Sequence, residues 1–452
     1  DMYRGLIEGA AFLPSEFLSF VNPVGGNNRG RIYRIVPRDR THNPFPRLGE
    51  LSSLELVSLL EHPNGWHRDT ASRLLYSRQD DDVIVPLKKL ALESVFPVGR
   101  ITALYALKGM RQLECFLVQK ALSDLHPEVR AHALRLAETF SEMQILESRL
   151  ERLASDPSPR VRFQLALSLG TFRPNAKNPI LLQMIEAESH LPWMRFALLC
   201  SIRESGADLF RSLVNNTKLL HSESGKVFLL ELVQQMGRQG QQRQVDMVWH
   251  VVMELSDEQI RETMLLSLLD AVSAQSRKAL VKESSGRLDA FVKRVVSRAA
   301  ARSRNKSLSD SQRVEAIGRL RFGSFEQVKE LLVELLHISE SKPIQVVSLK
   351  TLGRFEDMAV AAMIMTSLKQ LSPDVRNQAM ETILSRPSWV KRFLTAVENG
   401  EMTTNSLDPG RIQLLEKHPD PEVSAKVRKL FSRGTSIKKT EVIQRYRESL
   451  TL

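Results

Sequence analysis

The stretch HPEVRAHALRLAET, residues 126–139, decides the fold class. Its apolar residues recur at helical spacing and form one stripe: Val129, Ala133, Leu134 and Leu136. Arg130 and Arg135 project away from this stripe. Pro127 stands at the start, where the amide hydrogen that proline lacks would have no partner inside a helix. The stretch therefore predicts an amphipathic helix that follows a Pro-bearing turn.

The same pattern recurs along the chain. Further copies lie at 62–75, 96–110 and 156–171, and later, weaker ones at 191–205, 341–355, 372–385 and 418–431. The first five copies start 34, 30, 30 and 35 residues apart, at 62, 96, 126, 156 and 191. Each interval accommodates two helices of roughly 11–13 residues and two turns, which is one helical hairpin. A single hairpin buries too little apolar surface to fold alone, so the copies predict an all-α fold, an α-solenoid of roughly eleven to twelve stacked hairpins.

These motifs resemble HEAT repeats, in particular the short bacterial type with the pattern H-P-[DE]-x-x-V-R-x-x-A-x-x-A-L. Residues 126–134 match it closely, and so do residues 156–162. Residues 207–340 depart from it, because the spacing stretches and long segments there keep helical periodicity without proline. We expect the fold to continue through them, and the number of repeats stays open.

Composition excludes several classes of protein. The 452 residues exceed one ordinary core, and Lys+Arg 64 against Asp+Glu 52 give a formal charge of +12. That charge allows nucleic acid, anionic lipid or an acidic protein as partner. The two cysteines, Cys115 and Cys200, exclude a disulfide scaffold, an iron–sulfur cluster and a four-cysteine zinc site. Both have apolar neighbours, which favours two buried free thiols, and no apolar run is long enough to span a membrane.

The two ends of the chain differ from the repeat region 50–433. Residues 31–38 (RIYRIVPR) alternate in the manner of a strand, between a turn at 22–30 and a Pro-bearing linker at 38–49. We therefore expect a short β-containing stub over 1–49, and a C-terminal helix within 434–452.

Both ends also resemble a known family. DMYRGLIEGAAFLPS (1–15) and NNRGRIYRIVP (27–37) look like the last blade of a sugar-dehydrogenase-like β-propeller in planctomycete-type membrane-bound dehydrogenases. Residues 62–80 resemble that family's first HEAT repeat, and 438–452 resemble the helix before its cytochrome c domain.

This resemblance implies a parent protein in which the solenoid connects a propeller to a haem domain with a C-x-x-C-H site, in a periplasmic or otherwise exported location. Neither cysteine here has a second cysteine three residues away, so haem c is expected in a domain outside this chain. The hypothesis is a non-catalytic scaffold that links the two domains and offers a concave groove to a protein partner. Any dehydrogenase activity would belong to the absent domains.

No catalytic, cofactor or metal site is predicted. The pairs His62 and His67, and His126 and His132, lack the four-residue spacing that places two ligands on one helix face. His62, His126 and His418 each precede Pro and are interpreted as turn residues. No nucleophile motif or small-molecule substrate is evident. An enzyme with a site in the solenoid groove stays an alternative that would need an acid–base pair.

Two kinds of binding residue are candidates. Trp66 and Trp193 occupy matching places in the repeat turn, near Arg68 and Arg195, and Trp and Arg are favoured interface anchors. The competing and favoured interpretation is that each ring packs over the next hairpin.

The segment 292–306 carries basic residues and no acidic ones: Lys293, Arg294, Arg298, Arg302, Arg304 and Lys306. Spacings of four place three of its arginines on one helix face, suited to an anionic polymer or lipid. A solvated outer face is the favoured interpretation of this segment.

Overall fold

The computed structural model describes residues 47–141, 144–202, 206–403 and 407–431, with short pieces between residues 6 and 29. These residues are helical and contain no strand, which confirms the predicted all-α solenoid. The strand expected at 31–38 and the helix expected at 438–452 lie outside the described residues, so the predicted domain limits stay predictions. The chain forms two compact units, Asp1–Gln164 and Leu165–Leu452, and each is considered by itself.

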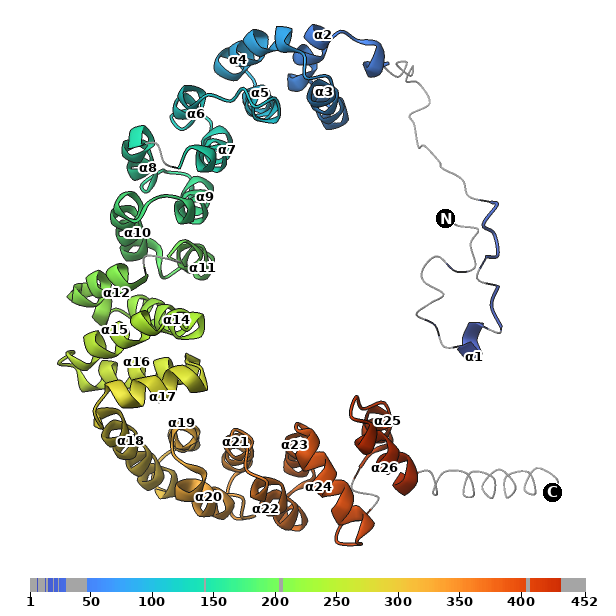
Figure 1. Cartoon of the computed structure of the whole chain (residues 1–452), viewed down its shortest axis with the longest axis vertical. Coiled ribbons are helices and arrows are strands. Elements are labelled where there is room, and N and C mark those ends of the chain that lie inside the picture. The colour runs from blue at the N-terminus through green and yellow to red at the C-terminus, as the bar shows by residue number, and fades with distance from the viewer. Residues whose placement is uncertain are drawn as a thin grey trace. The chain divides into compact units, whose positions relative to one another are not determined.

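Unit 1 consists of helical hairpins. Its helices are α2 (Ser53–Ser58), α3 (Gly65–Arg78), α4 (Ile84–Glu93), α5 (Pro97–Gly109), α6 (Cys115–Ala121), α7 (Pro127–Ala137) and α8 (Glu147–Leu153). The second helices of the hairpins, α3, α5 and α7, pack side by side in one row, and α2, α4 and α6 form the other row (Figure 1). Helix α9 (Pro159–Ser168) crosses from unit 1 into unit 2. The repeat motifs at 62–75, 96–110 and 126–139 supply the row of α3, α5 and α7, as predicted.

Helix α7 shows why the motif forms a helix. Nδ1 of His126 accepts the Glu128 amide hydrogen at 3.3 Å, so the residue before Pro127 caps the helix. The predicted stripe of Val129, Ala133, Leu134 and Leu136 is buried. The helix therefore depends on its neighbours for stability, as expected of one repeat in a stack.

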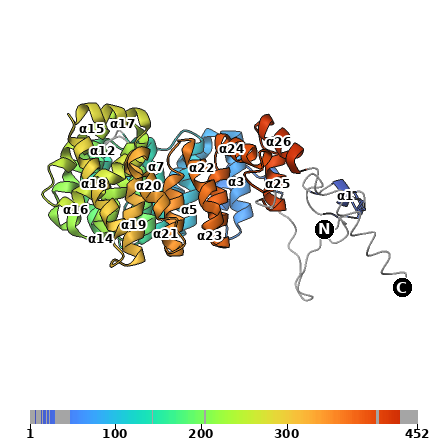
Figure 2. The same cartoon turned by 90° about the horizontal axis from the view of Figure 1, so that it is seen from below.

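Unit 2 continues the hairpins. Its helices are α10 (Pro174–Glu188), α11 (Pro192–Ser201), α12 (Gly206–Asn215), α13 (Thr217–His221), α14 (Glu223–Gln239), α15 (Gln242–Met253), α16 (Glu258–Ala271), α17 (Ala274–Glu283), α18 (Arg287–Arg304), α19 (Asp310–Arg319), α20 (Phe325–Glu334), α21 (Lys342–Leu352), α22 (Ala359–Ser367), α23 (Pro373–Leu384), α24 (Pro387–Glu398), α25 (Pro409–Glu416) and α26 (Pro421–Phe431). Helices α14 and α16 pack together in one row, and α19, α21 and α23 pack in sequence (Figure 2). Large aromatic side chains, among them Trp249 and Trp389, fill the space between the rows.

The stretched middle of the sequence has a structural cause. An additional helix, α17, lies between the hairpin α15/α16 and the hairpin α18/α19 and packs on α15 and α18. The turn before α16 also has no proline. Asp257 starts this helix instead, by accepting the amide hydrogens of Gln259 and Ile260. Repeats therefore continue through 207–340, where the sequence left their number open.

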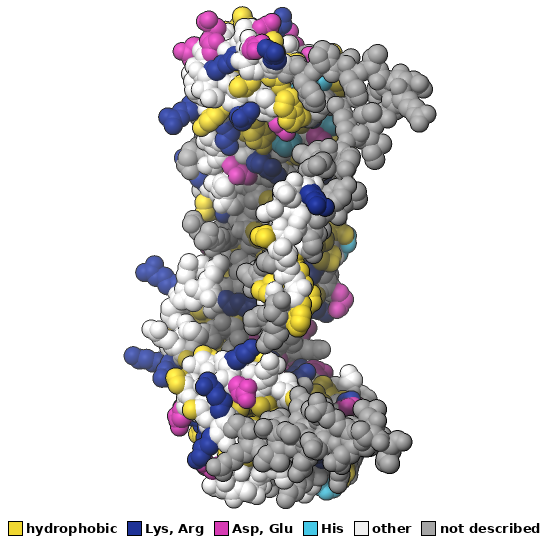
Figure 3. Space-filling view, turned by 90° about the vertical axis from the view of Figure 1, so that its right-hand side faces the viewer, with side chains coloured by type: hydrophobic (Ala, Val, Ile, Leu, Met, Phe, Trp, Pro, Cys, Tyr) yellow, Lys and Arg dark blue, Asp and Glu magenta, His cyan; other side chains and the backbone are white. Residues whose placement is uncertain are grey.

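Within the described residues, no helix combines the length and the apolar character that crossing a bilayer requires. The surface carries apolar patches with Lys and Arg side chains between them (Figure 3).

Candidate functional site

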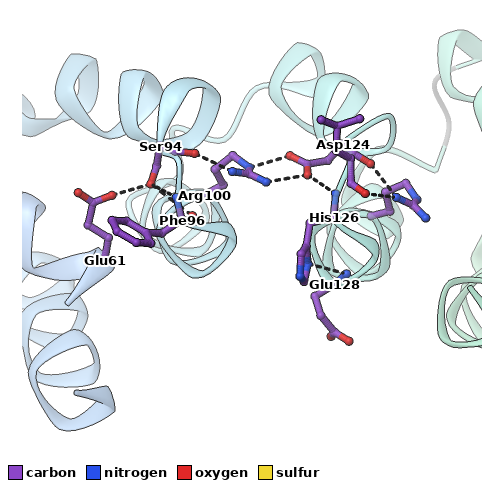
Figure 4. A network of polar contacts seen from close by, with 9 residues as sticks. Glu61, Ser94, Phe96, Arg100, Asp124, His126 and Glu128 are labelled. Atoms are coloured by element: carbon purple, nitrogen blue, oxygen red, sulfur yellow. Dashed lines mark hydrogen bonds and ion pairs between the residues drawn. The ribbon is translucent and has the colours of Figure 1, made fainter. Parts of the chain in front are cut away.

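A chain of ion pairs fixes the turns of unit 1 (Figure 4). Nε and Nη2 of Arg100 donate to the two carboxylate oxygens of Asp124 at 2.7 and 2.8 Å, and Nη1 donates to the Ser94 carbonyl at 2.6 Å. One repeat later, Arg130 donates in the same way to Asp156, at 2.7 and 2.8 Å, and to the Asp124 carbonyl at 2.8 Å. Each arginine therefore binds its own turn to the following one.

The network reaches the preceding turn as well. The Ser94 hydroxyl donates to Glu61 at 2.5 Å and accepts the Phe96 amide hydrogen at 3.1 Å. The side chains of Arg130 and Asp156 are only 12% and 5% exposed. Bidentate pairs of this kind hold a fixed geometry, so these turns form a rigid frame.

Large apolar side chains project from the same turns. Trp66, Phe96 and Leu125 are 57%, 53% and 98% exposed. Phe96 and Leu125 stand in the turns before α5 and α7, and Trp66 is the second residue of α3, directly after the preceding turn. These three helices pack side by side. We call these three residues the unit 1 turn edge. Exposed apolar groups on a rigid frame lose little conformational freedom when a partner covers them.

The favoured interpretation of the two tryptophans was wrong. Trp66 is 57% exposed and Trp193 is 76% exposed, so neither ring is buried over the next hairpin. The ring of Trp66 makes an edge contact with His67 at 5.4 Å. Proline or glycine at the first helical position places each tryptophan at the second one, where its side chain points out of the packed stripe.

The two arginines near these rings stabilise turns. Arg68 donates to the carbonyls of His62 and Pro63 at 2.6 and 2.9 Å. Arg195 pairs with Glu231 at 2.7 Å and donates to the Ser189 carbonyl at 3.1 Å. Each predicted Trp–Arg pair thus consists of an exposed ring and a turn-forming arginine, and its role in binding stays a prediction.

The histidines before proline are turn residues, as predicted. Nδ1 of His62, His126 and His418 accepts the amide hydrogen two residues later, at 3.0, 3.3 and 3.0 Å. In the described part of the chain, no group of three or more His, Cys, Asp or Glu side chains could hold a metal ion.

The prediction of two buried thiols was wrong. Cys115 is half-buried and Cys200 is exposed, and both are free. Ala197 and Leu198 of α11 are buried, whereas Cys200 lines a hollow at the surface together with Leu199.

The basic segment forms most of α18. Two of the three arginines predicted to share a helix face, Arg298 and Arg302, line one hollow of about 410 Å³ between α16, α18 and α19, and Arg294 does not line it. Three of the six cations are paired: Arg298 with Glu262 at 3.0 Å and Glu258 at 3.3 Å, Arg304 with Glu334 at 3.2 Å, and Lys306 with Glu340 at 3.7 Å. Among the described residues, Lys293, Arg294 and Arg302 have no carboxylate partner. Sequence analysis missed these pairs because the carboxylates come from other helices and, for Glu340, from the turn before α21.

A second hollow, of about 560 Å³, lies between α11 and α14. We call it the α11–α14 groove. Sequence analysis missed it, and it missed Phe96 and Leu125 as well. The available signal for the groove was a run of residues on α14, Gln234, Gln235 and Gln239, that recurs at helical spacing.

One comparison with known protein families supports the repeat fold. Residues 116–200 match the family of HEAT repeats, which confirms the predicted repeat type over that range. A solved structure of Kap121p bound to Pho4p shares 12% identity at a TM-score of 0.45, covering 84% of this chain and 49% of that one. Importin beta in an ammonium sulfate condition shares 14% identity at a TM-score of 0.42, covering 84% and 56%. The chain spans about half the length of these solenoids, and no curated protein matches its sequence significantly. The comparisons show neither the dehydrogenase family nor a β-propeller.

Proposed function

We propose that this chain is a non-catalytic protein-interaction scaffold whose unit 1 turn edge binds a protein partner. The exposure of Trp66, Phe96 and Leu125 carries this proposal. The turns beside them are linked by the Ser94–Glu61 hydrogen bond and by the Arg100–Asp124 and Arg130–Asp156 pairs. Aromatic and aliphatic anchors on a rigid surface are typical of interaction sites.

The hollow between α16, α18 and α19 supports a role without catalysis. Both oxygens of Glu262 are engaged, one by Arg298 at 3.0 Å and the other by Arg319 at 2.6 Å. Arg319 also pairs with Glu315 at 2.7 Å. Because guanidinium groups from α18 and α19 hold both oxygens of this α16 carboxylate, the charged groups that line this hollow connect three helices and stabilise the fold.

The finer part of the proposal concerns the parent protein. The resemblance of 1–15, 27–37 and 438–452 to one family supports a scaffold that links a sugar-dehydrogenase-like propeller to a cytochrome c domain in an exported protein. Reading the gene on both sides of this chain tests it. We expect propeller strands before residue 1 and a C-x-x-C-H motif after residue 452. Absence of both contradicts the linker role and leaves the turn edge untouched.

The turn edge has its own test. A triple variant, Trp66→Ser, Phe96→Ser and Leu125→Ser, is compared as bait with the wild type in quantitative affinity capture from the native source. The matched control changes Leu54, Val85 and Leu92 to Ser, since these are also exposed apolar residues of unit 1 but lie in α2 and α4. We expect a partner that the control retains and the edge variant loses. Equal capture by all three baits contradicts the proposal.

Anion binding by α18 is a second candidate, favoured by the three cations without a carboxylate partner among the described residues. We propose Lys293, Arg294 and Arg302 as its site. The test is elution from heparin, and binding to vesicles with anionic lipid, by a variant with these three changed to Glu. The control changes Arg304, which is paired, to Glu. A lower elution salt for the triple variant alone supports the site, and equal elution of the wild type and both variants contradicts it.

A further inference from the structure

The α11–α14 groove has two chemically different walls. On α11 the lining residues recur at helical spacing and are largely apolar: Pro192, Phe196, Leu199 and Cys200. On α14 they recur at the same spacing and are polar: Gln234, Gln235, Arg238 and Gln239. Phe196 is 58% exposed, so the apolar wall faces solvent and has no cover among the described residues.

Contacts across the groove hold the two walls in place. Arg195 and Glu231 form an ion pair at 2.7 Å between α11 and α14. The amide nitrogen of Gln235 donates to the Leu199 carbonyl across the groove at 3.0 Å. That of Gln234 donates at 3.0 Å to the Ser267 hydroxyl of α16, a helix that does not line the groove. The side-chain amides are therefore oriented before any ligand binds, which lowers the entropic cost of binding.

One cation of the groove is available. Arg195 is neutralised by Glu231, whereas Arg238 is exposed and its one hydrogen bond, at 3.3 Å, goes to the neutral Gln234. A guanidinium has five donors, so most of those on Arg238 are free for a carboxylate. The charge pattern thus favours a single negative group over a polyanion.

We propose that the α11–α14 groove binds an extended segment of a protein partner that carries an apolar side chain and, close to it, an Asp or Glu. The apolar side chain packs on Phe196 and Leu199. The glutamine amides bond the peptide main chain, because an amide offers both a donor and an acceptor, as a peptide group does. The carboxylate binds Arg238.

The dimensions fit this ligand. From Pro192 to Cys200 on α11, and from the lining residue Glu231 to Gln239 on α14, each helix advances eight residues, which is about 12 Å at 1.5 Å per residue. An extended peptide advances about 3.3 Å per residue, so the groove accommodates about four residues. The inference goes beyond the proposed function: it concerns unit 2 and does not depend on the unit 1 turn edge.

An array of hexapeptides tests the proposal with purified full chain. Each peptide has one apolar residue (Leu, Phe or Val) and one Asp or Glu at varied spacing in a Ser/Gly background. Matched peptides replace the acid by its amide or the apolar residue by Ser. We expect binding to the acidic, apolar set, and loss of about tenfold or more in affinity when the carboxylate becomes an amide.

Variants locate the site. Arg238→Gln and Phe196→Ser are each expected to lower affinity about tenfold or more while the circular dichroism spectrum stays unchanged. Arg238→Glu is expected to shift preference to peptides that carry Lys in place of the acid. The turn-edge triple variant serves as control and should bind the peptides as the wild type does. No binding by any peptide, or wild-type binding by Arg238→Gln and Phe196→Ser, overturns the proposal.

Discussion

Arg100 and Arg130 each perform two structural tasks in the turns of unit 1, and Arg130 shows both. It donates to the Asp124 carbonyl in its own turn and to the carboxylate of Asp156 in the next. Asp156 in turn accepts the amide hydrogen of Ser158 at 2.9 Å, so one carboxylate serves the ion pair and the start of the following helix. The geometry of neighbouring turns is therefore set by a few side chains.

Replacing Asp156 with Ala should be strongly destabilising. It leaves a guanidinium that is 12% exposed without its partner, and the loss of one member of a buried pair costs about 3–5 kcal/mol. The expected result is a lower urea-unfolding midpoint, followed by circular dichroism. The control is Asp374→Ala, which removes the exposed pair Lys342–Asp374 and should change the midpoint little. Equal effects of the two variants would show that the buried pair is not a structural link.

His132 should make unit 1 sensitive to acid. Burial lowers the pKa of His132 below its ordinary value of 6.5, and the nearby Arg135 lowers it further; Nδ1 lies 3.1 Å from the Tyr105 hydroxyl. The unfolded chain then binds a proton more readily than the folded one, so stability falls as the pH drops below about 6.5. We expect the urea midpoint to fall less between about pH 7.5 and 5.5 in His132→Gln than in the wild type. An identical fall in both would contradict this assignment.

Sequence alone allowed a correct interpretation of some single residues and not of others. The turn-forming role of His62, His126 and His418 follows from their place before proline, which is local information. The partner of Arg130 lies 26 residues away, and the carboxylate partner of Arg298 lies 36 away, so neither pair can be read locally. The exposure of a turn side chain could not be predicted from the sequence either. The residues around Leu125 are the same whether its side chain is buried against a neighbouring hairpin or exposed to solvent.

At the scale of elements, glycine decides how closely α14 and α16 approach. A Cβ atom on Gly237 would lie 2.8 Å from the Cβ of Ala271 on α16, which is closer than real Cβ contacts. Gly237→Ala should therefore lower stability by about 1–3 kcal/mol. Gly318→Ala in α19 is the matched control, because its Cβ would meet only the tip of Arg321 at 3.6 Å, and it should raise stability by up to about 1 kcal/mol. Urea unfolding measures the stability of both variants. A change of stability in the same direction for Gly237→Ala and Gly318→Ala would refute the packing argument.

Helix α18 should respond unequally to charge reversal. Arg298→Glu would place a carboxylate beside Glu262, whose side chain is 9% exposed, whereas Arg302 has no carboxylate partner among the described residues. We expect Arg298→Glu to lower the thermal unfolding midpoint and Arg302→Glu to leave it nearly unchanged. The effect should be smaller than for Asp156→Ala, since Arg319 still pairs with Glu262. A reversed order would mean that the Arg298 pair does not stabilise α18.

The elements themselves were largely predictable where proline marks a helix start. Helices α5, α7, α11 and α23 begin at Pro97, Pro127, Pro192 and Pro373, all inside the quoted motifs. The helices of the middle segment, residues 207–340, were harder to predict from the sequence. Asp257 caps α16 without a proline, and α17 is an additional helix outside the repeat pattern. A periodic apolar stripe indicates a helix but does not say which hairpin that helix belongs to.

At the scale of the whole chain, the solenoid was predictable from repeat spacing, and the binding surfaces were not. Spacing of 30–35 residues requires stacked hairpins whatever the partner is. The turn edge and the α11–α14 groove depend on which side chains the stack leaves uncovered, and that is a property of three-dimensional packing. The basic net charge did not predict either surface, because a net charge includes cations in ion pairs and cations without a partner equally.

The central claim is that the chain works as a scaffold through its unit 1 turn edge. Hydroxyl-radical footprinting tests it most directly, on the chain captured in its native complex and on the free chain. We predict that oxidation of Trp66, Phe96 and Leu125 falls several-fold in the complex, while the exposed apolar residues Leu54 and Val85 of the same unit are oxidised as before. Equal oxidation of the turn edge in both states, or protection at Leu54 and Val85 in its place, would contradict the claim.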